Sequence, residues 1–476
     1  MTKNQFKCIV LAPAVIAGNA CALQEKTTEQ PNIIYILTDQ QSASMMSCAG
    51  NQWVKTPAMD YIAANGVRFT RAYTTNPVST PARVSMMTGW MPGCFRDAQG
   101  MPVRENNGGM RITEIPDAVK GKNIGTIMQQ AGYELVYGGK QHLPKGLQPE
   151  TFGFQVISKD ERDELAASVA SYLKKEHAKP YFLIVSLINP HDICYMAIRD
   201  CGVTESELTT VRNAKTEVAT LDEALKIPKG ISMTEFFANH CPPLPPNYEP
   251  QIDEPQAVNR LLNLRPFRKN AREKYTDEQW RMHRWAYCRL TEMVDRQIQV
   301  ILDALKESGQ ERNTLVLLSS DHGDMDAAHR LEHKTVLYEE SANIPFLAMW
   351  KGKIAGGRVD SVHLVSNMLD LLPTVSDYAG KPAFTDAKGR SLRPLLENKK
   401  TDWRKFLGVD SELGSMIVDE NKRKYIRYDA VGIEEQLLDL KADPYETKHF
   451  TDHPDYTAVL SDFRKQFAAW FHEKNK

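Results

Sequence analysis

Four short apolar segments, spread over most of the chain, constrain the fold more than any other feature. Each has the length of a strand and is apolar throughout rather than alternating, which is typical of strands covered on both faces of a sheet. Polar residues of kinds that bind metals or transfer protons follow each segment. The four segments and the residues that follow them are 33–37 with Thr38-Asp39-Gln40, 133–137 with Lys140-Gln141-His142, 181–188 with Asn189-Pro190-His191-Asp192, and 314–318 with Asp321-His322-Gly323-Asp324.

Segments with helical periodicity lie between these apolar segments. Residues 57–65, 121–131 and 277–308 each read as a helix, and a glycine follows each one. The alternation of strands and helices predicts an α/β fold, with a large, mostly parallel central sheet flanked by helices. In open sheets of this kind the site forms outside the carboxyl ends of the strands. We therefore expect the polar residues after the four strands to share one site.

Two regions depart from the alternation. Residues 195–275 contain a proline-rich stretch and a basic stretch, and we interpret them as an insertion over the strand ends that acts as a lid or specificity element. After a helix expected at 364–378, short strand-like pieces and a closing helix at 455–473 predict a smaller α+β domain, an antiparallel sheet plus a helix. We therefore expect a catalytic domain at 23–378 and a C-terminal domain at 379–476.

The N-terminus has the three parts of a secretory signal. Two early lysines form a positive region, residues 8–17 are apolar but too short to span a bilayer, and Ala20-Cys21-Ala22 fits a cleavage site. We expect a signal peptide at 1–22 that is cleaved on export, which places the mature protein in the periplasm. Two alternatives stay open: lipidation of Cys21, which Gly18 fits poorly, and an uncleaved cytosolic N-terminus. No other stretch approaches ~18 unbroken apolar residues, so we expect no transmembrane span.

The charge balance argues against one class of partner. The 476 residues include 59 Lys and Arg against 60 Asp and Glu, a net charge of −1, whereas nucleic-acid-binding proteins usually carry a basic excess. We therefore expect no nucleic-acid partner. An anionic substrate would have to be bound by a local site rather than by the charge of the whole molecule.

The sharpest short motif is Ser79-Thr80-Pro81-Ala82-Arg83. Pro81 fits the first turn of a helix, where its missing N–H costs nothing, and Ser79 would then lie just ahead of the helix. Free N–H groups and the helix dipole at such a position favour an anion or oxyanion. Arg83 lies one turn along and could reach the same oxyanion. Taken alone, the pattern fits a plain serine helix cap better than an anion site.

Together, the motifs of this chain resemble those of the sulfatase family of the alkaline-phosphatase-like superfamily. The resemblance runs in order from residue 31 to residue 450. It rests on Pro31-Asn32-Ile33-Ile34 with Asp39, Ser79-Thr80-Pro81-Ala82-Arg83 with Thr88-Gly89, Lys140-Gln141-His142, Asp321-His322-Gly323-Asp324, His333-Lys334 with Tyr338-Glu339-Glu340-Ser341, and Leu438-Asp439-Leu440 with Asp443-Pro444-Tyr445-Glu446-Thr447.

The resemblance implies a modified residue and a metal ion. In this family a maturase oxidises the Cys or Ser of the signature, here Ser79, to formylglycine, whose hydrate attacks sulfur with one hydroxyl and expels sulfate through the other. One hard divalent cation, usually Ca²⁺, is held by oxygen-rich ligands. The matching positions are Asp39, Gln40, Asp321, His322 and Ser79 itself. Gln40 departs from the commoner second Asp, and His322 stands where Asn is a frequent alternative.

The resemblance also implies roles for the remaining residues. Arg83 and Lys140 would orient the formylglycine, and His142 would be the base that acts on its hydrate. His191 would be the general acid for the leaving oxygen. Lys334 would bind the sulfate group, although His333 beside it stays open as the alternative.

The expected function is that of a sulfuric ester hydrolase acting on a sulfated carbohydrate. Export and the long insertion suit a sugar polymer or oligosaccharide better than a small aryl sulfate. One alternative is a phosphoester or phosphonate hydrolase of the same superfamily, and another is a non-catalytic protein that binds sulfated glycans. The identity of the sugar, the sulfate position, exo or endo action and the oligomeric state stay open.

Overall fold

The computed structural model of the chain describes residue 1 and residues 30–96, 99–106, 110–384 and 386–474. Apart from residue 1, the predicted signal peptide at 1–22 lies outside the described residues. Among the described helices, none combines the length and the apolar character needed to cross a membrane.

A sheet of eight strands, in the order β5-β4-β6-β1-β7-β8-β2-β9, forms the centre of the molecule. The four predicted strands are its adjacent members β4, β6, β1 and β7, all mutually parallel. β8 runs antiparallel to both of its neighbours, so the sheet is mostly parallel, as predicted. The strands are β1 (Asn32–Asp39), β2 (Gly66–Phe69), β4 (Glu134–Gly139), β5 (Gln155–Ser158), β6 (Tyr181–Pro190), β7 (Thr314–Ser320), β8 (Phe346–Met349) and β9 (Arg358–Asp360).

Helices cover both faces of this sheet, which explains why its central strands are continuously apolar. Alternate residues of β1 show the division. Ile33 and Leu37 pack against α2 (Ser79–Thr88), α4 (Ile124–Gln130) and α14 (Leu371–Tyr378). Ile34 and Ile36 pack on the opposite face against α1 (Pro57–Ala64), α5 (Leu165–Leu173) and the long helix α12 (Asp277–Glu307).

The helix expected at 364–378 is shorter than predicted. Val365–Ser366 forms strand β10, which pairs with β3 (Ala72–Tyr73), and the helix α14 begins only at Leu371. The Asp370 carboxylate accepts the Ser366 N–H at 2.9 Å, which holds the turn between strand and helix. The apolar run at the start of this segment therefore belongs to a short strand.

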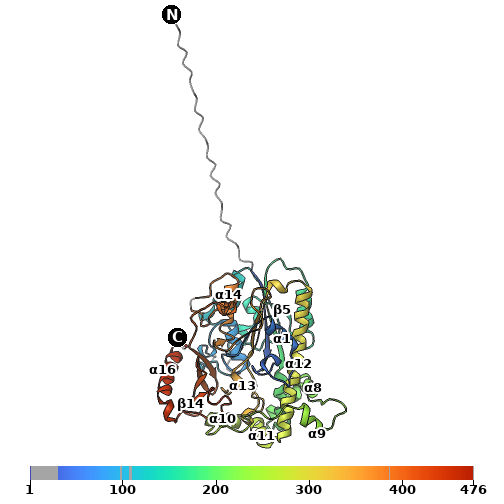
Figure 1. The fold of residues 1–476 in the computed structure, drawn as a ribbon, viewed down its shortest axis with the longest axis vertical. Coiled ribbons are helices and arrows are strands. Elements are labelled where there is room, and N and C mark those ends of the chain that lie inside the picture. Colours follow the sequence, from blue (N-terminus) through green and yellow to red (C-terminus); the bar gives the residue numbers. More distant parts are fainter. Residues whose placement is uncertain (2–29, 97–98, 107–109, 385, 475–476) are drawn as a thin grey trace.

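The insertion at 195–275 consists mainly of short helices rather than of a loop. It follows β6 directly, and its helices gather at the lower end of the molecule in Figure 1. The basic stretch around 265–272 is partly internal, because Arg268 is buried and Arg272 pairs with Glu254 at 2.8 Å. The helices are α6 (Cys194–Cys201), α7 (Glu205–Asn213), α8 (Lys215–Ala224), α9 (Met233–Glu235), α10 (Gln256–Leu264) and α11 (Pro266–Lys274).

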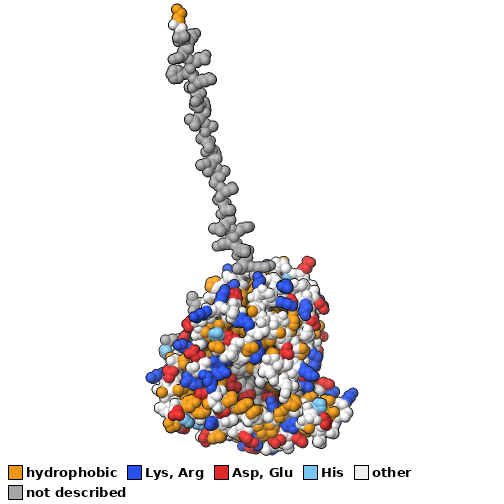
Figure 2. Space-filling view, in the orientation of Figure 1, with side chains coloured by type: hydrophobic (Ala, Val, Ile, Leu, Met, Phe, Trp, Pro, Cys, Tyr) orange, Lys and Arg blue, Asp and Glu red, His pale blue; other side chains and the backbone are white. Residues whose placement is uncertain are grey.

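The C-terminal region forms a second, antiparallel sheet with a helix packed on it, as predicted. Its four strands lie in chain order, and the closing helix packs on them through an apolar cluster of its own. On the face drawn in Figure 2, acidic and basic side chains are interspersed, in keeping with the net charge of −1. The elements are β11 (Phe406–Ser411), which the sequence did not predict, β12 (Gly414–Asp419), β13 (Arg423–Tyr428), β14 (Glu434–Asp439) and α16 (Thr457–Lys474).

A buried ion pair joins this C-terminal sheet to the larger part of the molecule. Lys424 Nζ lies 2.6 Å from Glu446 Oε1 and 3.1 Å from Glu339 Oε1, and both Lys424 and Glu446 are fully buried. Glu446 also accepts the Glu339 N–H at 2.7 Å, at the start of α13 (Glu339–Ala342).

We expect Glu446→Ala to lower the free energy of unfolding by about 3–5 kcal/mol, because it leaves the Lys424 charge buried without its main partner. Denaturant unfolding followed by circular dichroism measures the change. The control is Glu223→Ala, which breaks an exposed pair with Lys226 and should cost less than ~1 kcal/mol. Equal losses in the two variants would contradict the role assigned to the buried pair.

Candidate active site

The carboxyl ends of the four central strands bring the predicted polar residues together at one edge of the sheet. Asp39 is the last residue of β1, Lys140 follows β4, His191 follows β6 and Asp321 follows β7. Because the strands are adjacent and parallel, these positions meet in space. Lys140 Nζ and Asp39 Oδ2, for example, are 2.6 Å apart although 101 positions separate the two residues in the chain.

Ser79 lies at the N-terminus of α2, beside these strand ends. It is the first residue of the helix rather than the residue before it, since Val78 has the extended conformation of the cap position. Ser79 is fully buried, and its Oγ lies 3.2 Å from Asp39 Oδ2 and 3.0 Å from His322 Nε2. The hydroxyl therefore faces the cluster of charged groups instead of capping the helix.

Arg83, one turn along α2, contacts all four central strands or the residues that follow them. Its guanidinium pairs with Asp39 and Asp321, each at 3.0 Å. It also donates to the Lys140 carbonyl at 3.2 Å and to Ser186 Oγ at 2.7 Å. Burial would lower the pKa of Arg83, but the two carboxylates more than offset this and raise it. Arg83 is thus a permanent cation that fixes the geometry of the site.

Asp39, Asp321 and His322 form a group that can hold a metal ion. Their ligand atoms lie within 4.8 Å of one another, and all three residues are fully buried. Asp39 Oδ1 has no hydrogen-bond partner among the described residues. His322 Nδ1 lies 2.9 Å from the Gly323 carbonyl, which only an N–H can satisfy, so Nε2 keeps its lone pair. Two carboxylates and this nitrogen fit a divalent cation.

The charges of the two carboxylates favour a cation between them. Burial would raise the pKa of Asp39, but Lys140, His191 and Arg83 offset burial and hold it well below its usual range. Burial and the neighbouring Asp39 raise the pKa of Asp321 to about 6, against the effect of Arg83. The repulsion between the two carboxylates is what a bound cation would relieve.

Gln40 adopts a left-handed backbone conformation, with φ 67°, and its amide lies between two charged side chains. Its Nε2 donates to Asp324 at 2.7 Å, and its Oε1 accepts from Lys334 Nζ at 2.8 Å. The Gln40 side chain therefore holds Lys334 at the site. Its amide oxygen, Oε1, already accepts a hydrogen bond from that lysine. His333, by contrast, packs its ring against Phe267, with 5.1 Å between ring centroids.

His142 and His191 lie at the edge of the cluster without a hydrogen bond to its members. Burial and nearby Lys140 and Arg83 lower the pKa of His142 to about 3. Burial, followed by Lys140, also lowers the pKa of His191 well below its ordinary value. Both rings are therefore neutral here at pH 7, and a bound anion would raise both pKa values.

A buried ion pair holds the turn that carries His191. Asp192 accepts from Arg162, with 2.8 Å between Asp192 Oδ1 and Arg162 Nη2, and the Asp192 N–H donates to Asn189 Oδ1 at 3.2 Å. The thiol of Cys194 lies 3.9 Å from His191 Nε2. The position of His191 is thus set by its neighbours in the turn.

Sequence reasoning missed several residues that support the site. Ser186 lies inside the apolar run of β6, and Tyr287 lies on α12, where its hydroxyl donates to the Gln40 carbonyl at 2.6 Å. Neither carries a local signal, because each acquires its partner only when distant segments pack. Asp324 belongs to a motif that the sequence did reveal, but its contact with Gln40 was not predictable.

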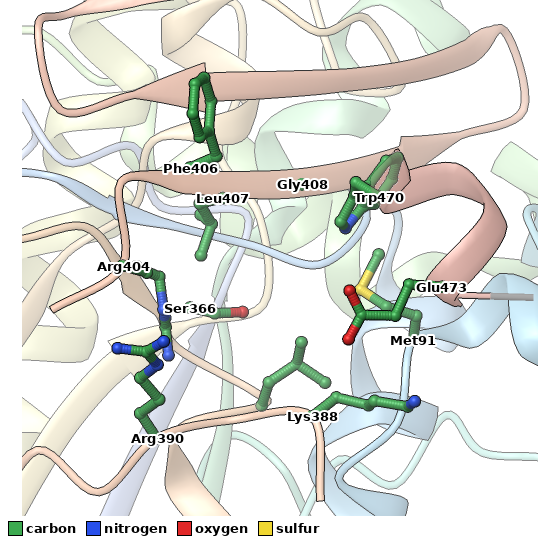
Figure 3. Close-up of a pocket in the computed structure, with 11 residues that line it drawn as sticks. Met91, Ser366, Lys388, Arg390, Arg404, Phe406, Leu407, Gly408, Trp470 and Glu473 are labelled. Atoms are coloured by element: carbon green, nitrogen blue, oxygen red, sulfur yellow. The ribbon is translucent and has the colours of Figure 1, made fainter. Parts of the chain in front are cut away.

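A separate cavity lies where the C-terminal sheet and helix meet the larger part of the molecule (Figure 3). Its volume is about 230 Å³, and its lining includes Lys388, Arg390, Arg404 and Trp470. None of the residues that line it belongs to the cluster around Ser79, so this cavity is not the candidate active site.

Comparison with known proteins identifies the family to which the chain belongs. The model of a family described as Sulfatase matches residues 31–381, and one described as N-sulphoglucosamine sulphohydrolase, C-terminal, matches residues 327–473. A Delta 4,5-hexuronate-2-O-sulfatase of Bacteroides thetaiotaomicron is 27% identical over 93% of this chain and 89% of its own length. Arylsulfatase K of Homo sapiens is 26% identical over 94% of this chain and 84% of its own length.

A solved structure also supports membership of a sulfatase family. That of a 2-O GAG sulfatase has a TM-score of 0.77 and 25% sequence identity, covering 94% of this chain and 93% of that chain. The matched family model spans the strand ends, α2 and the candidate metal group. The chain therefore belongs to the sulfatase family of the alkaline-phosphatase-like superfamily and is a sulfuric ester hydrolase.

Proposed function

We propose that this protein removes sulfate from a sulfated carbohydrate and that Ser79, converted to formylglycine, is its nucleophile. The observation that carries the proposal is the position of Ser79 Oγ, buried between Asp39 and His322 at the N-terminus of α2. Formylglycine there would supply, as its hydrate, one hydroxyl to attack sulfur and another whose deprotonation expels sulfate. Because Ser79 is fully buried, a maturase would have to act on it before the chain folds.

The residues proposed to hold the cation are Asp39, Gln40, Asp321, His322 and Ser79. The free Oδ1 of Asp39 and the available Nε2 of His322 support this set. The predominance of oxygen ligands favours Ca²⁺, and one such ion would polarise the sulfate oxygens.

The other residues act on protons and on the sulfate charge. We assign His142 as the base for the hydrated formylglycine, because its ring is neutral and its Nδ1 is buried without a partner among the described residues. His191 would carry a proton to the leaving oxygen once bound sulfate raises its pKa. Lys140 would orient the formylglycine, and Lys334, tied to Gln40, would bind a sulfate oxygen.

The sugar class is supported by relatives. The Bacteroides thetaiotaomicron relatives include a Delta 4,5-hexuronate-2-O-sulfatase and an N-acetylglucosamine-6-O-sulfatase. The phosphonate monoester hydrolase of Agrobacterium radiobacter, with a TM-score of 0.67 and 20% identity, shares the fold alone. Phosphoester or phosphonate hydrolysis is therefore the alternative function. The sulfatase-type motif Ser79–Arg83 argues against it.

The organisation of the chain is part of the same proposal. Residues 23–378, with the insertion at 195–275, would form the catalytic domain and residues 379–476 the C-terminal domain. The apolar cluster formed by the C-terminal sheet and α16 supports a separate unit there. The signal at 1–22 would direct the chain to the periplasm.

The test of the proposed function is sulfate release from a panel of sulfated mono- and disaccharides that differ in sulfate position. The matching sugar phosphates form the control arm. We expect release of sulfate from at least one member and turnover of the corresponding phosphate at least about 100-fold slower, a difference of about 2.7 kcal/mol in transition-state stabilisation. Faster release of phosphate than of sulfate would overturn the proposal in favour of the alternative.

We expect Asp39→Asn to lose the binding of Ca²⁺ by at least about tenfold, because one anionic ligand is replaced by a neutral amide. Isothermal titration calorimetry of the metal-free protein with Ca²⁺ measures this without reference to activity. The matched control is Asp303→Asn, the same change on the exposed face of α12, which should leave the affinity unchanged. Unaltered binding by the Asp39 variant would remove this residue from the proposed set.

A further inference from the structure

Five charged residues that the proposed chemistry does not use gather beside Ser79 and Lys334. They come from three distant parts of the chain: the segment before residue 107, the junction of α10 and α11, and the turn between β11 and β12. Two of them are exposed, Glu105 and Arg265; two are half-buried, Arg104 and Glu412; and Arg268 is buried. We call this set the rim cluster; its members are Arg104, Glu105, Arg265, Arg268 and Glu412.

Hydrogen bonds place the first part of the rim cluster against the nucleophile. The Thr80 N–H donates to Asn106 Oδ1 at 3.1 Å, and Asn76 Nδ2 donates to the Arg104 carbonyl at 3.2 Å. Thr80 directly follows Ser79 in α2. Arg104 and Glu105 are therefore held over the N-terminus of that helix.

A second set of contacts places the other members against the proposed sulfate-binding residue. Arg268 Nη1 donates to the Lys334 carbonyl at 2.9 Å. The next residue, Thr335, donates its N–H to the Pro77 carbonyl at 3.0 Å and accepts from Ser411 Oγ at 2.6 Å. Ser411 precedes Glu412 in the turn between β11 and β12, so this turn lies over the same segment.

The guanidinium groups of the rim cluster have donors to spare. The Arg268 side chain is only 8% exposed, and its Nε has no hydrogen-bond partner among the described residues; Glu332 Oε1, at 3.7 Å, is too far. Nε and Nη2 of Arg104 are also buried without a partner in the described part of the chain. A buried, charged donor left unpaired is costly, so a bound molecule is the natural source of acceptors.

The carboxyl groups of the rim cluster supply acceptors beside these donors. Burial raises the pKa of Glu412. The charges of Arg265 and Arg268 act against this and lower it, whereas the adjoining carboxyl of Glu105 raises it further. Burial lowers the pKa of Arg268 to about 10, with Glu412 acting against it. The two carboxyls and two arginines thus lie within reach of one another.

We propose that the rim cluster binds hydroxyl groups of the sugar ring that carries the scissile sulfate. Each sugar hydroxyl is both a donor and an acceptor, and the unpaired guanidinium donors next to a carboxyl pair match both needs. An aryl ring would leave these groups unpaired. This inference rests on the proposed function, and it makes the rim cluster the feature that selects polyhydroxylated sulfate esters.

The test compares two ligands of the same site. Inorganic sulfate occupies only the sulfate-binding part, whereas the sulfated sugar found in the panel also reaches the rim cluster. We expect Glu412→Gln and Glu105→Gln each to raise KM for the sugar about 10- to 100-fold, while the inhibition constant of inorganic sulfate stays unchanged. The matched control is Glu420→Gln, in the exposed turn between β12 and β13 of the same sheet, with both constants unchanged.

Two results would overturn the inference: an unchanged KM in both variants, or parallel changes in KM and in the inhibition constant of sulfate. Calorimetric binding of the sulfated sugars to Ser79→Ala protein, with and without Glu412→Gln, separates this failure from that of the proposed function. If wild-type protein releases no sulfate, the function is wrong. The rim cluster is then judged by whether Glu412→Gln weakens sugar binding, and undiminished binding rejects it.

Discussion

Ser79→Ala protein is expected to release sulfate from its sugar substrate on the order of 10⁵-fold more slowly than the wild type, the effect of removing a catalytic nucleophile. Alanine has no atom that can be oxidised to an aldehyde or that can attack sulfur. Nothing else near the cluster replaces it, because the hydroxyl of Ser79 alone lies within 3.2 Å of both Asp39 and His322 among the described serines and threonines. Sulfate release under saturating substrate measures the loss.

The control for this prediction lies on the same helix. Ser85 is also a buried serine of α2, and its Oγ has no hydrogen-bond partner among the described residues. Ser85→Ala should therefore keep activity within about twofold, since no catalytic or paired group is removed. Comparable losses in the two variants would mean that the helix, and not the Ser79 hydroxyl, is what the reaction requires.

His142→Ala is expected to lower kcat by about 10²- to 10⁴-fold, the contribution of a positioned general base. The ring lies beside Lys140 and Arg83 and is neutral, so it can accept a proton from the hydrated formylglycine. KM should change little, because His142 is assigned to proton transfer rather than to binding. Steady-state kinetics give both constants, and circular dichroism verifies that the fold is intact.

The exposed histidine of the insertion serves as the control for His142. His240→Ala also removes an imidazole, but His240 lies at the surface, near Glu235. It should keep wild-type kcat. Wild-type activity in His142→Ala protein would show that His142 is not the base. His191 would then be the next candidate for that role.

The central part of the fold was predictable because its strands are buried on both faces. A strand such as β1 has to be apolar at every position, and this leaves a signal that is read without an alignment. The edge of the sheet leaves no such signal. The edge strand β9 has three residues and is only partly buried, and β10, in the separate two-stranded sheet with β3, has two residues, so neither is long enough to show a period. These two strands form only because they pair with strands that are distant in the sequence.

The residue types of the site were predictable, but their contacts were not. Asp39, Asp321 and His322 follow strands, and the parallel arrangement brings them together. Gln40 was predicted as a metal ligand, but the hydrogen bonds of its amide to Lys334 and Asp324, made from a backbone with φ 67°, were not predictable. Arg268 was read as part of a basic stretch, and nothing in that stretch indicated that the packing of α11 buries this residue. Such contacts depend on tertiary packing.

The modification of Ser79 is the central claim, and mass spectrometry tests it most directly. Trypsin cleavage after Arg71 and Arg83 releases the peptide 72–83, which contains this serine. In protein produced together with a formylglycine-generating maturase, we expect a peptide lighter by two hydrogens, in a fraction that rises with specific activity. A fully active protein whose peptide carries only unmodified Ser79 would contradict the claim.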